Sequence, residues 1–373
     1  MSRTLVFAYC TLLAAALVAL AVVYAGRGGA AEGDPVAEAV EQIVEDDPLT
    51  PAQAALDTAL SQLGGGFEGH AGIAVRSLDE QDERTIHFNG LEPFPQQSVS
   101  KMWVALTALE AVDDGDLDLD EMAQVRFEDL TVFHQPVRNI VLARGSFSTS
   151  WSDLLSRAIR TSDNTANDML LRRVGGPQEV QAVLDDKKLG SIRFGTDERT
   201  KQSAIAGVSW EQRLAVGPAF YDRRDQVPDD VRRHAFEAYL ADPMDGAAPV
   251  AVADALARLG RGELLSQEST ARLLADMAAV KSGPNRLKGG LPPGWAIAHK
   301  TGTGQYFDGE QSGYNDIGIL AAPDGRRYAV VIMIARTRRP VPELMDFMHR
   351  VVAAVADYHA ASGGELVSET GRR

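Results

Sequence analysis

The chain has 373 residues, of which 45% are hydrophobic and 24% charged, and its formal net charge at pH 7 is −15. This composition is sufficient for a sizeable core, in one large domain or two intertwined ones. The acidic balance argues against nucleic acid or an anionic membrane surface as a partner. The single cysteine, Cys10, lies in the N-terminal apolar run, so the rest of the chain has no disulfide framework and no cysteine-based metal site.

The N-terminus is typical of a secretory signal. Arg3 precedes an apolar run over residues 5–25, and Val23-Tyr24-Ala25 has the small-residue spacing of a cleavage site. The run is close to the ~20 residues that span a bilayer, so an uncleaved membrane anchor is the alternative. Both interpretations predict an exported, periplasmic protein. Residues 26–48, rich in Gly, Ala, Glu and Asp, are predicted to be a flexible acidic linker.

Regular structure is predicted from residue 50 onward. Thr50 and Pro51 have the N-cap and first-position preferences of a helix, which we expect to end at the Gly64-Gly65-Gly66 run. Alternating apolar and polar residues then predict strands over 72–77 and 84–88, joined by a polar turn.

The next stretch carries the first chemical motif, Ser98-Val99-Ser100-Lys101. An apolar run with helical spacing follows over 104–112, which places Ser98 at or just inside a helix N-terminus and Lys101 one turn further on the same face. A serine hydroxyl needs a neighbouring base to act as a nucleophile, and a lysine can serve if its pKa is lowered. Taken alone, the same pattern also fits a capping serine and a solvated lysine.

The remaining chain predicts helices followed by strands. A sheet assembled from two segments, 49–92 and 291–362, would enclose a helical domain over 93–290, with a disordered tail over 363–373. The predicted helices cover 152–159, 178–185, 248–259, 269–280 and 343–359, and the later strands cover 296–300, 317–322 and 328–335.

Two further motifs favour a catalytic role for the first one. Ser162-Asp163-Asn164 follows the helix over 152–159, and Lys300-Thr301-Gly302 ends the strand that begins at residue 296. The three motifs in this order are the signature set of penicillin-recognising serine enzymes. Over residues 50–360 the chain resembles class A serine β-lactamases, including the stretch 287–295 and Tyr314-Asn315-Asp316-Ile317. The resemblance implies an α+β (α/β/α) fold, in which helices cover an antiparallel five-stranded sheet and an all-helical domain is inserted.

The resemblance assigns a role to each motif residue. Ser98 would be the nucleophile, and Lys101 would take its proton directly or through a water. Ser162 would relay a proton to the leaving nitrogen of the lactam, with help from Lys300. Asn164 would hold Lys101 and the substrate amide.

Substrate binding is assigned to the third motif and its neighbour. Lys300, Thr301 and Thr303 would bind the substrate carboxylate, because an ammonium with two hydroxyls suits a carboxylate. Gly302 would let the substrate lie against the strand edge. The backbone N–H groups of Ser98 and Thr303 would form the oxyanion hole.

The residue that activates the deacylating water is less clearly marked. Class A enzymes have a Glu-x-x-Leu-Asn pattern after the second motif, and this pattern is missing here. Glu198 is the candidate, with Gln202 in the place of the asparagine; alternatively, Glu198 pairs with an arginine on a solvated loop. An insertion over 203–240 enlarges or covers the loop beside the cleft and contains Glu237, a weaker rival for the base.

The sequence therefore predicts an exported serine β-lactamase that forms an acyl-enzyme on Ser98. The alternatives are a D,D-peptidase or penicillin-binding acyltransferase acting on cell-wall peptides, and a non-hydrolytic sensor that keeps the pocket. No metal or organic cofactor is implied, because serine, lysine and a carboxylate suffice, and the histidines have no metal spacing. We make no prediction of the oligomeric state.

Overall fold

The computed structural model describes residues 48–79, 82 and 84–364. The predicted signal or anchor segment over 1–25, nearly all of the predicted linker and most of the predicted tail lie outside these residues. From Thr50 onward the described chain forms one compact unit. No helix in this part of the chain is long and apolar enough to cross a membrane.

The centre of the fold is a five-stranded antiparallel sheet in the order β2-β1-β11-β10-β7. It is built from both ends of the chain, which confirms the predicted fold class. The strand that carries the third motif, β7, runs to Thr303, three residues beyond its predicted end at residue 300. The whole Lys-Thr-Gly motif therefore lies within β7. The strands are β1 (His70–Ser77), β2 (Thr85–Phe88), β7 (Ala296–Thr303), β10 (Tyr314–Ala321) and β11 (Arg327–Arg336).

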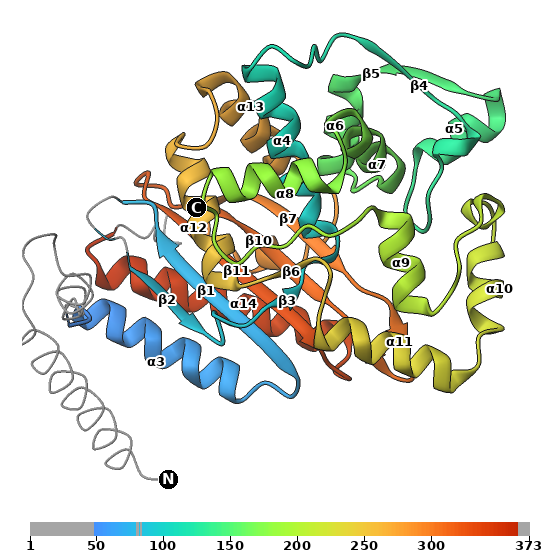
Figure 1. Cartoon of the computed structure of the whole chain (residues 1–373). Coiled ribbons are helices and arrows are strands. Elements are labelled where there is room, and N and C mark those ends of the chain that lie inside the picture. The colour runs from blue at the N-terminus through green and yellow to red at the C-terminus, as the bar shows by residue number, and fades with distance from the viewer. Residues whose placement is uncertain (1–47, 80–81, 83, 365–373) are drawn as a thin grey trace, which may run out of the picture. The chain divides into compact units, whose positions relative to one another are not determined.

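Helices from distant parts of the chain cover the sheet (Figure 1). The first described helix, α3 (Pro51–Gly65), packs against the last, α14 (Val341–Ala361), and against β2. Thr50 accepts a hydrogen bond from Gln53 N and completes a capping box, as its N-cap preference predicts. Helix α12 (Pro249–Arg261) packs against β1 and β11 and shares a core with the motif helices.

The helical part is organised around α4 (Lys101–Asp113), whose residues 101–109 are all buried. A 3₁₀ turn, η1 (Gln97–Ser100), leads into it, so Ser98 lies in the tight turn immediately before the α-helix. The other elements of this part are β3 (Phe94–Pro95), β4 (Met122–Val125), η2 (Phe127–Asp129), α5 (Val137–Arg144), β5 (Phe147–Ser150), α6 (Trp151–Arg160), α7 (Asn164–Arg173), α8 (Pro177–Asp186), β6 (Gly246–Ala247), α13 (Gln267–Ala278) and η4 (Leu287–Gly290). The division into sheet and helical domains at residues 92 and 291 stays a prediction.

The predicted insertion over 203–240 is largely helical. It comprises the rest of α9 (Glu198–Ala206), then η3 (Gln212–Ala215), α10 (Ala219–Asp225) and most of α11 (Asp229–Ala241). Helix α11 is tied to the hairpin of β8 (Tyr306–Phe307) and β9 (Glu310–Gln311) that follows β7. The guanidinium groups of Arg232 and Arg233 lie 4.4 Å and 4.6 Å from the centroid of the Phe307 ring.

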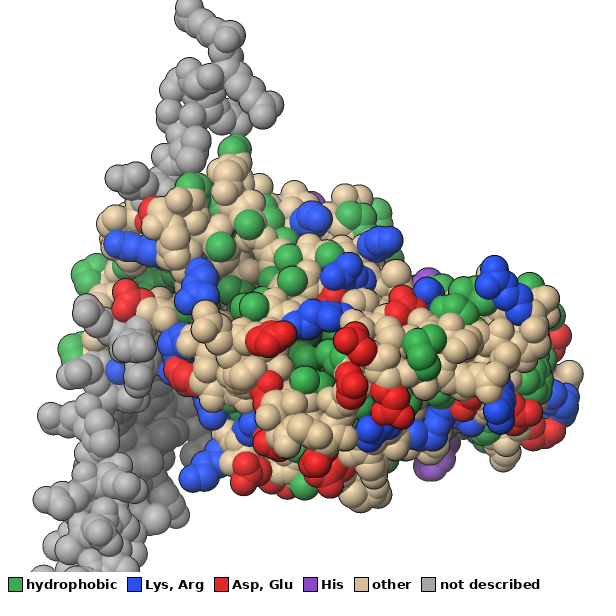
Figure 2. Space-filling view, turned by 90° about the horizontal axis from the view of Figure 1, so that it is seen from above, with side chains coloured by type: hydrophobic (Ala, Val, Ile, Leu, Met, Phe, Trp, Pro, Cys, Tyr) green, Lys and Arg blue, Asp and Glu red, His purple; other side chains and the backbone are tan. Residues whose placement is uncertain are grey.

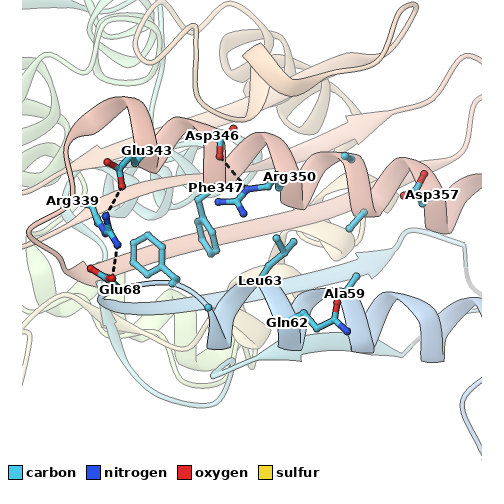
Figure 3. A pocket seen from close by; sticks show the side chains of 14 residues that line it. Ala59, Gln62, Leu63, Glu68, Arg339, Glu343, Asp346, Phe347, Arg350 and Asp357 are labelled. Atoms are coloured by element: carbon cyan, nitrogen blue, oxygen red, sulfur yellow. Dashed lines mark ion pairs between the residues drawn. The ribbon is translucent and has the colours of Figure 1, made fainter.

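The surface has mixed charge where it can be seen from above. On the face in Figure 2, acidic and basic side chains are interspersed, with no broad basic patch. A groove of about 620 Å³ lies between α3 and α14 (Figure 3). Most of its charged lining is paired internally, with Arg339 bridging Glu68 and Glu343, and Arg350 pairing with Asp346. No residue of the three motifs lines it.

Candidate active site

Ser98 and Lys101 meet as their helical spacing predicts. Lys101 Nζ donates to Ser98 Oγ at 2.9 Å. The serine is partly exposed, whereas Lys101 is completely buried. Gln97, the residue before the serine, has a φ of 55°, in the left-handed region, which turns the chain sharply into α4. The nucleophile candidate is therefore accessible while its candidate base is shielded from water.

The sheet holds this turn in place. Asn315 of β10 donates from Nδ2 to Pro95 O at 2.7 Å and to Gln96 O at 3.1 Å. Gly302 of β7 approaches the same segment so closely that a Cβ there would lie 2.3 Å from Gln96 O. Glycine is therefore required at this position of the third motif for a reason that the sequence did not reveal. Without a side chain, it lets β7 approach the turn that carries Ser98.

Glu198 reaches the same cluster from another element, α9. It is the first residue of α9, where Asp197 caps the helix by accepting from Thr200 N at 2.9 Å. Its side chain is 3% exposed, and Oε1 accepts from Lys101 Nζ at 2.7 Å. The alternative of an arginine partner on a solvated loop is therefore wrong. The rival Glu237 lies on α11, where its side chain is 42% exposed and pairs with Arg336.

A second lysine joins this pair. Lys201, one turn further along α9, lies with its Nζ 3.3 Å from the same Glu198 Oε1 and 3.3 Å from Asp245 Oδ2. Burial alone would raise the pKa of Glu198, but Lys101 and Lys201 outweigh it and hold that pKa well below its usual range. For Lys101 burial dominates, and together with the charge of Lys201 it lowers the lysine pKa despite Glu198. Glu198 is thus a carboxylate, and Lys101 is the more readily deprotonated lysine.

The second and third motifs also meet. Lys300 Nζ donates to Ser162 Oγ at 3.0 Å and to Thr301 O at 3.0 Å. Burial, followed by the positive charge of Lys101, places the pKa of Lys300 well below its usual value. Asp163, between Ser162 and Asn164, caps α7 through Ala166 N at 3.1 Å and accepts Val137 N at 2.8 Å. This second motif is therefore fixed by its own aspartate.

Asn164, the first residue of α7, makes a different contact from the one expected. Its Nδ2 donates to Val132 O at 2.8 Å. No hydrogen bond joins it to Lys101 among the described residues; the ammonium of Lys101 donates to Ser98 and Glu198 instead. The expectation that Asn164 holds Lys101 is wrong for this state of the protein, and its role toward a substrate amide stays a prediction.

A cation that the sequence did not reveal, Arg286, immediately precedes η4 and reaches the end of β7 with its side chain. Arg286 donates from Nη2 to Thr303 Oγ1 at 2.5 Å and from Nη1 to Gly302 O at 2.8 Å. Its guanidinium lies 3.7 Å from the centroid of the Tyr314 ring. Thr301 Oγ1 hydrogen-bonds to Ser282 Oγ at 2.6 Å. Lys300, Thr301, Thr303 and Arg286 therefore form one cationic, hydroxyl-rich edge suited to a carboxylate.

Two further polar residues support Glu198 and were also missed. The carboxylate of Asp168, on α7, accepts from Glu198 N at 3.3 Å through Oδ1, while its Oδ2 is buried without a hydrogen-bond partner. Burial, with the charges of Asp197 and Glu198, raises the pKa of Asp168 to about 7. Gln97 accepts from Gln202 Nε2 at 3.1 Å and donates to Tyr239 Oη at 2.7 Å, which joins the nucleophile turn to α9 and α11.

The described residues contain no group of three or more His, Cys, Asp or Glu side chains placed to hold a metal ion. His299, which precedes the third motif, hydrogen-bonds to Asp316 of the neighbouring strand at 2.9 Å.

Comparison with known proteins gives a consistent result. Residues 55–359 match the family model described as the Beta-lactamase enzyme family. The extended-spectrum β-lactamase PER-1 of Pseudomonas aeruginosa is 30% identical over 270 residues, which cover 72% of this chain and 76% of that protein. β-Lactamase VEB-1, also of Pseudomonas aeruginosa, is 24% identical over 76% of this chain and 82% of that protein.

Solved structures agree with the fold and the family. A β-lactamase from Chitinophaga pinensis has a TM-score of 0.66 and 26% identity, and the match covers 82% of this chain and 99% of that one. An ancestral class A β-lactamase has a TM-score of 0.63 and 27% identity, covering 81% of this chain and 99% of that one. Together with the three motifs, which the fold brings into contact, these matches define a penicillin-recognising serine fold. The chain belongs to the class A serine β-lactamase family.

Proposed function

We propose that this protein hydrolyses β-lactams through an acyl-enzyme on Ser98. The observation that supports this most directly is the position of Lys101, whose Nζ bonds both to Ser98 Oγ at 2.9 Å and to Glu198 Oε1 at 2.7 Å. One buried lysine therefore links the candidate nucleophile to the candidate base for deacylation. The β-lactamase names of PER-1 and VEB-1 support the same substrate class.

Acylation would use the first two motifs. Lys101, with its lowered pKa, takes the proton of Ser98 directly or through a water as Oγ attacks the lactam carbonyl carbon. The oxyanion faces the backbone N–H groups of Ser98 and Thr303. As the C–N bond breaks, Ser162 passes its proton to the lactam nitrogen and is resupplied through Lys300, 3.0 Å away. The substrate carboxylate lies at the edge formed by Lys300, Thr301, Thr303 and Arg286.

Deacylation would depend on Glu198. The carboxylate removes a proton from a water, and the resulting hydroxide attacks the ester carbon. As the ester C–O bond breaks, Ser98 Oγ leaves and takes back from Lys101 the proton that the lysine accepted during acylation. Because its pKa is held low, Glu198 is ionised and ready to accept that proton at neutral pH. A D,D-peptidase or penicillin-binding acyltransferase would share the acylation step but would leave the ester intact.

A time course with benzylpenicillin separates these functions. We expect the parent protein to open the lactam with a transient adduct visible by intact mass, and Ser98→Ala to form none. Glu198→Gln should acylate but accumulate the adduct, since a general base contributes roughly 10²–10⁴-fold to rate. Glu237→Gln, on the exposed face of α11, is the matched control. A stable adduct on the parent would favour the acyltransferase, and an adduct on Ser98→Ala would refute the nucleophile.

We also propose that the protein is exported to the periplasm, because Arg3 and the apolar run over 5–25 have the pattern of a signal or an anchor. Fractionation of cells that express the full chain is the test. Protein found in the soluble periplasm with a shortened N-terminus supports cleavage, whereas full-length protein in the membrane fraction supports the anchor. Protein found in the cytosol would refute export.

A further inference from the structure

Lys201 occupies an unusual position for a lysine. In the family pattern Glu-x-x-Leu-Asn, which begins here at Glu198, it stands in the place of the leucine. Its side chain is 3% exposed. Besides Glu198 Oε1 and Asp245 Oδ2, its ammonium lies 3.3 Å from Gln97 O and 3.4 Å from Ser100 Oγ. A buried cation thus replaces an apolar side chain directly beside the candidate base.

The surroundings of Lys201 are matched to its charge. An unpaired buried ammonium is strongly destabilising, and here two carboxylates, Glu198 and Asp245, face it. With Lys101, the group holds two cations and two anions within contact distance. Burial would lower the pKa of Lys201, but Glu198 and Asp245 outweigh it and keep the pKa above its usual value. The two carboxylates therefore favour the charged form of Lys201, whereas burial lowers the pKa of Lys101.

The geometry divides the two oxygens of Glu198 between different tasks. Oε1 accepts hydrogen bonds from both lysines, from Lys101 Nζ at 2.7 Å and from Lys201 Nζ at 3.3 Å. Oε2 accepts only from Gln202 Nε2, at 3.3 Å, among the described residues. A carboxylate pinned through one oxygen by two ammonium groups has a fixed plane, so the second oxygen keeps one direction. That oxygen is the one with capacity left to accept a proton from water.

We propose that Lys201 is a positioning residue for deacylation, which fixes Glu198 through Oε1 so that Oε2 faces the hydrolytic water. This inference rests on the proposed function. It gives Lys101 and Lys201 distinct tasks: Lys101 exchanges a proton with Ser98, and Lys201 supplies the charge that remains when Lys101 is neutral. Glu198 then keeps a cationic partner at every stage of the reaction.

The same lysine connects the base to the insertion. Asp245 follows α11 and accepts from Gln97 N at 2.8 Å and from Tyr239 Oη at 2.8 Å. Lys201 thus joins α9 to the point where the chain returns from the insertion. Because Asp245 keeps these two donors without Lys201, and Glu198 keeps Lys101, removing the ammonium leaves each carboxylate with a partner.

The test compares Lys201→Met with the parent and with Lys288→Met, a control on an exposed lysine of η4. Acylation and deacylation rate constants for benzylpenicillin are measured separately, by stopped flow and intact mass, from pH 2 to 9, because the low pKa of Glu198 places its acid limb below pH 4. We expect Lys201→Met to lower the deacylation rate constant roughly 10- to 100-fold while acylation changes less than about three-fold, since only the base is disturbed. Lys288→Met should match the parent in both.

The pH profile is the readout that a purely structural role would not change. Glu198 loses one of two cations in Lys201→Met, so the acid limb of its deacylation profile should move to higher pH by about one unit or more. The other titratable groups that act on this profile stay in place in the variant: Lys101 on α4, Asp168 on α7, Asp197 at the start of α9, Tyr239 on α11, Asp245 after it, and Lys300 on β7.

A second variant keeps the test decisive if Lys201→Met folds poorly. Lys201→Met with Asp245→Asn removes one cation and one anion together, so the buried charge stays balanced. If Lys201 positions Glu198, the double variant still deacylates slowly with a shifted acid limb. Normal deacylation in either variant, or an unshifted limb, overturns the inference alone. A parent protein that is never acylated overturns the proposed function and this inference with it.

Discussion

Replacing Asp168 with asparagine should stabilise the protein above pH 7 and leave its stability near pH 4 almost unchanged. The carboxyl of Asp168 is completely buried, one of its oxygens has no hydrogen-bond partner, and its pKa is raised to about 7. In the unfolded chain the same group ionises near its ordinary value of 3.8. The folded protein therefore holds a proton that the unfolded chain has lost over the range between these two values.

The sign and size of the effect follow from that difference. Where the folded state binds more protons, the free energy of unfolding falls as pH rises, by about 1.4 kcal/mol per pH unit for one proton. The contribution is fully present below pH 3.8 and is lost as pH rises through about 7. Over the whole interval the loss is about 4 kcal/mol. An asparagine never ionises, and its Oδ1 can still accept from Glu198 N.

Urea unfolding from pH 4 to 8.5 measures this difference. The parent and Asp168→Asn should have similar free energies of unfolding at pH 4, and the variant should be more stable by up to about 4 kcal/mol at pH 8. Asp186→Asn, on the exposed face of α8, makes the same change in net charge and should show no such divergence. Parallel curves for the parent and Asp168→Asn would refute the raised pKa.

Two other substitutions test the second motif and the carboxylate-binding edge. Asp163→Ala should lower the free energy of unfolding by about 2–4 kcal/mol, because α7 loses its cap and Val137 N is left buried without an acceptor; a loss under about 0.5 kcal/mol in urea unfolding would contradict this reasoning. Arg286→Ala should raise the KM for benzylpenicillin about 10- to 100-fold in steady-state assays, which is the equivalent of one charge-assisted contact. The KM of Arg286→Lys should lie between those of the parent and Arg286→Ala, because lysine keeps the charge but lacks the planar guanidinium. An unchanged KM in Arg286→Ala would exclude this arginine from carboxylate binding.

The parts of the fold that the sequence predicted are those with a strong local pattern. The cap at Thr50, the apolar periodicity after Lys101 and the alternation before Ser77 each specify an element without reference to the rest of the chain. The spacing of Ser98 and Lys101 also predicted their contact, because residues three apart share a helical face.

The parts that were missed depend on contacts between distant segments. Lys201, Asp168 and Arg286 are charged, and a charged residue in a single sequence is by default assigned to the surface. Only the fold shows that all three side chains are buried. Glu198 was found from its distance to the second motif, but its place in a helix was not predicted; the signal was Asp197, a favoured N-cap residue immediately before it.

The order of the strands also sets the order in which the protein can be completed during synthesis. β1 pairs with β11, so a strand that leaves the ribosome early has its partner only about 260 residues later, by the register that joins Val75 to Val330. Asn315, which holds the Ser98 turn, is made in the same late part of the chain. A nascent chain therefore contains Ser98 long before the strands that complete the active site have been synthesised. Acylation of Ser98 would report the moment at which the last strands join the sheet.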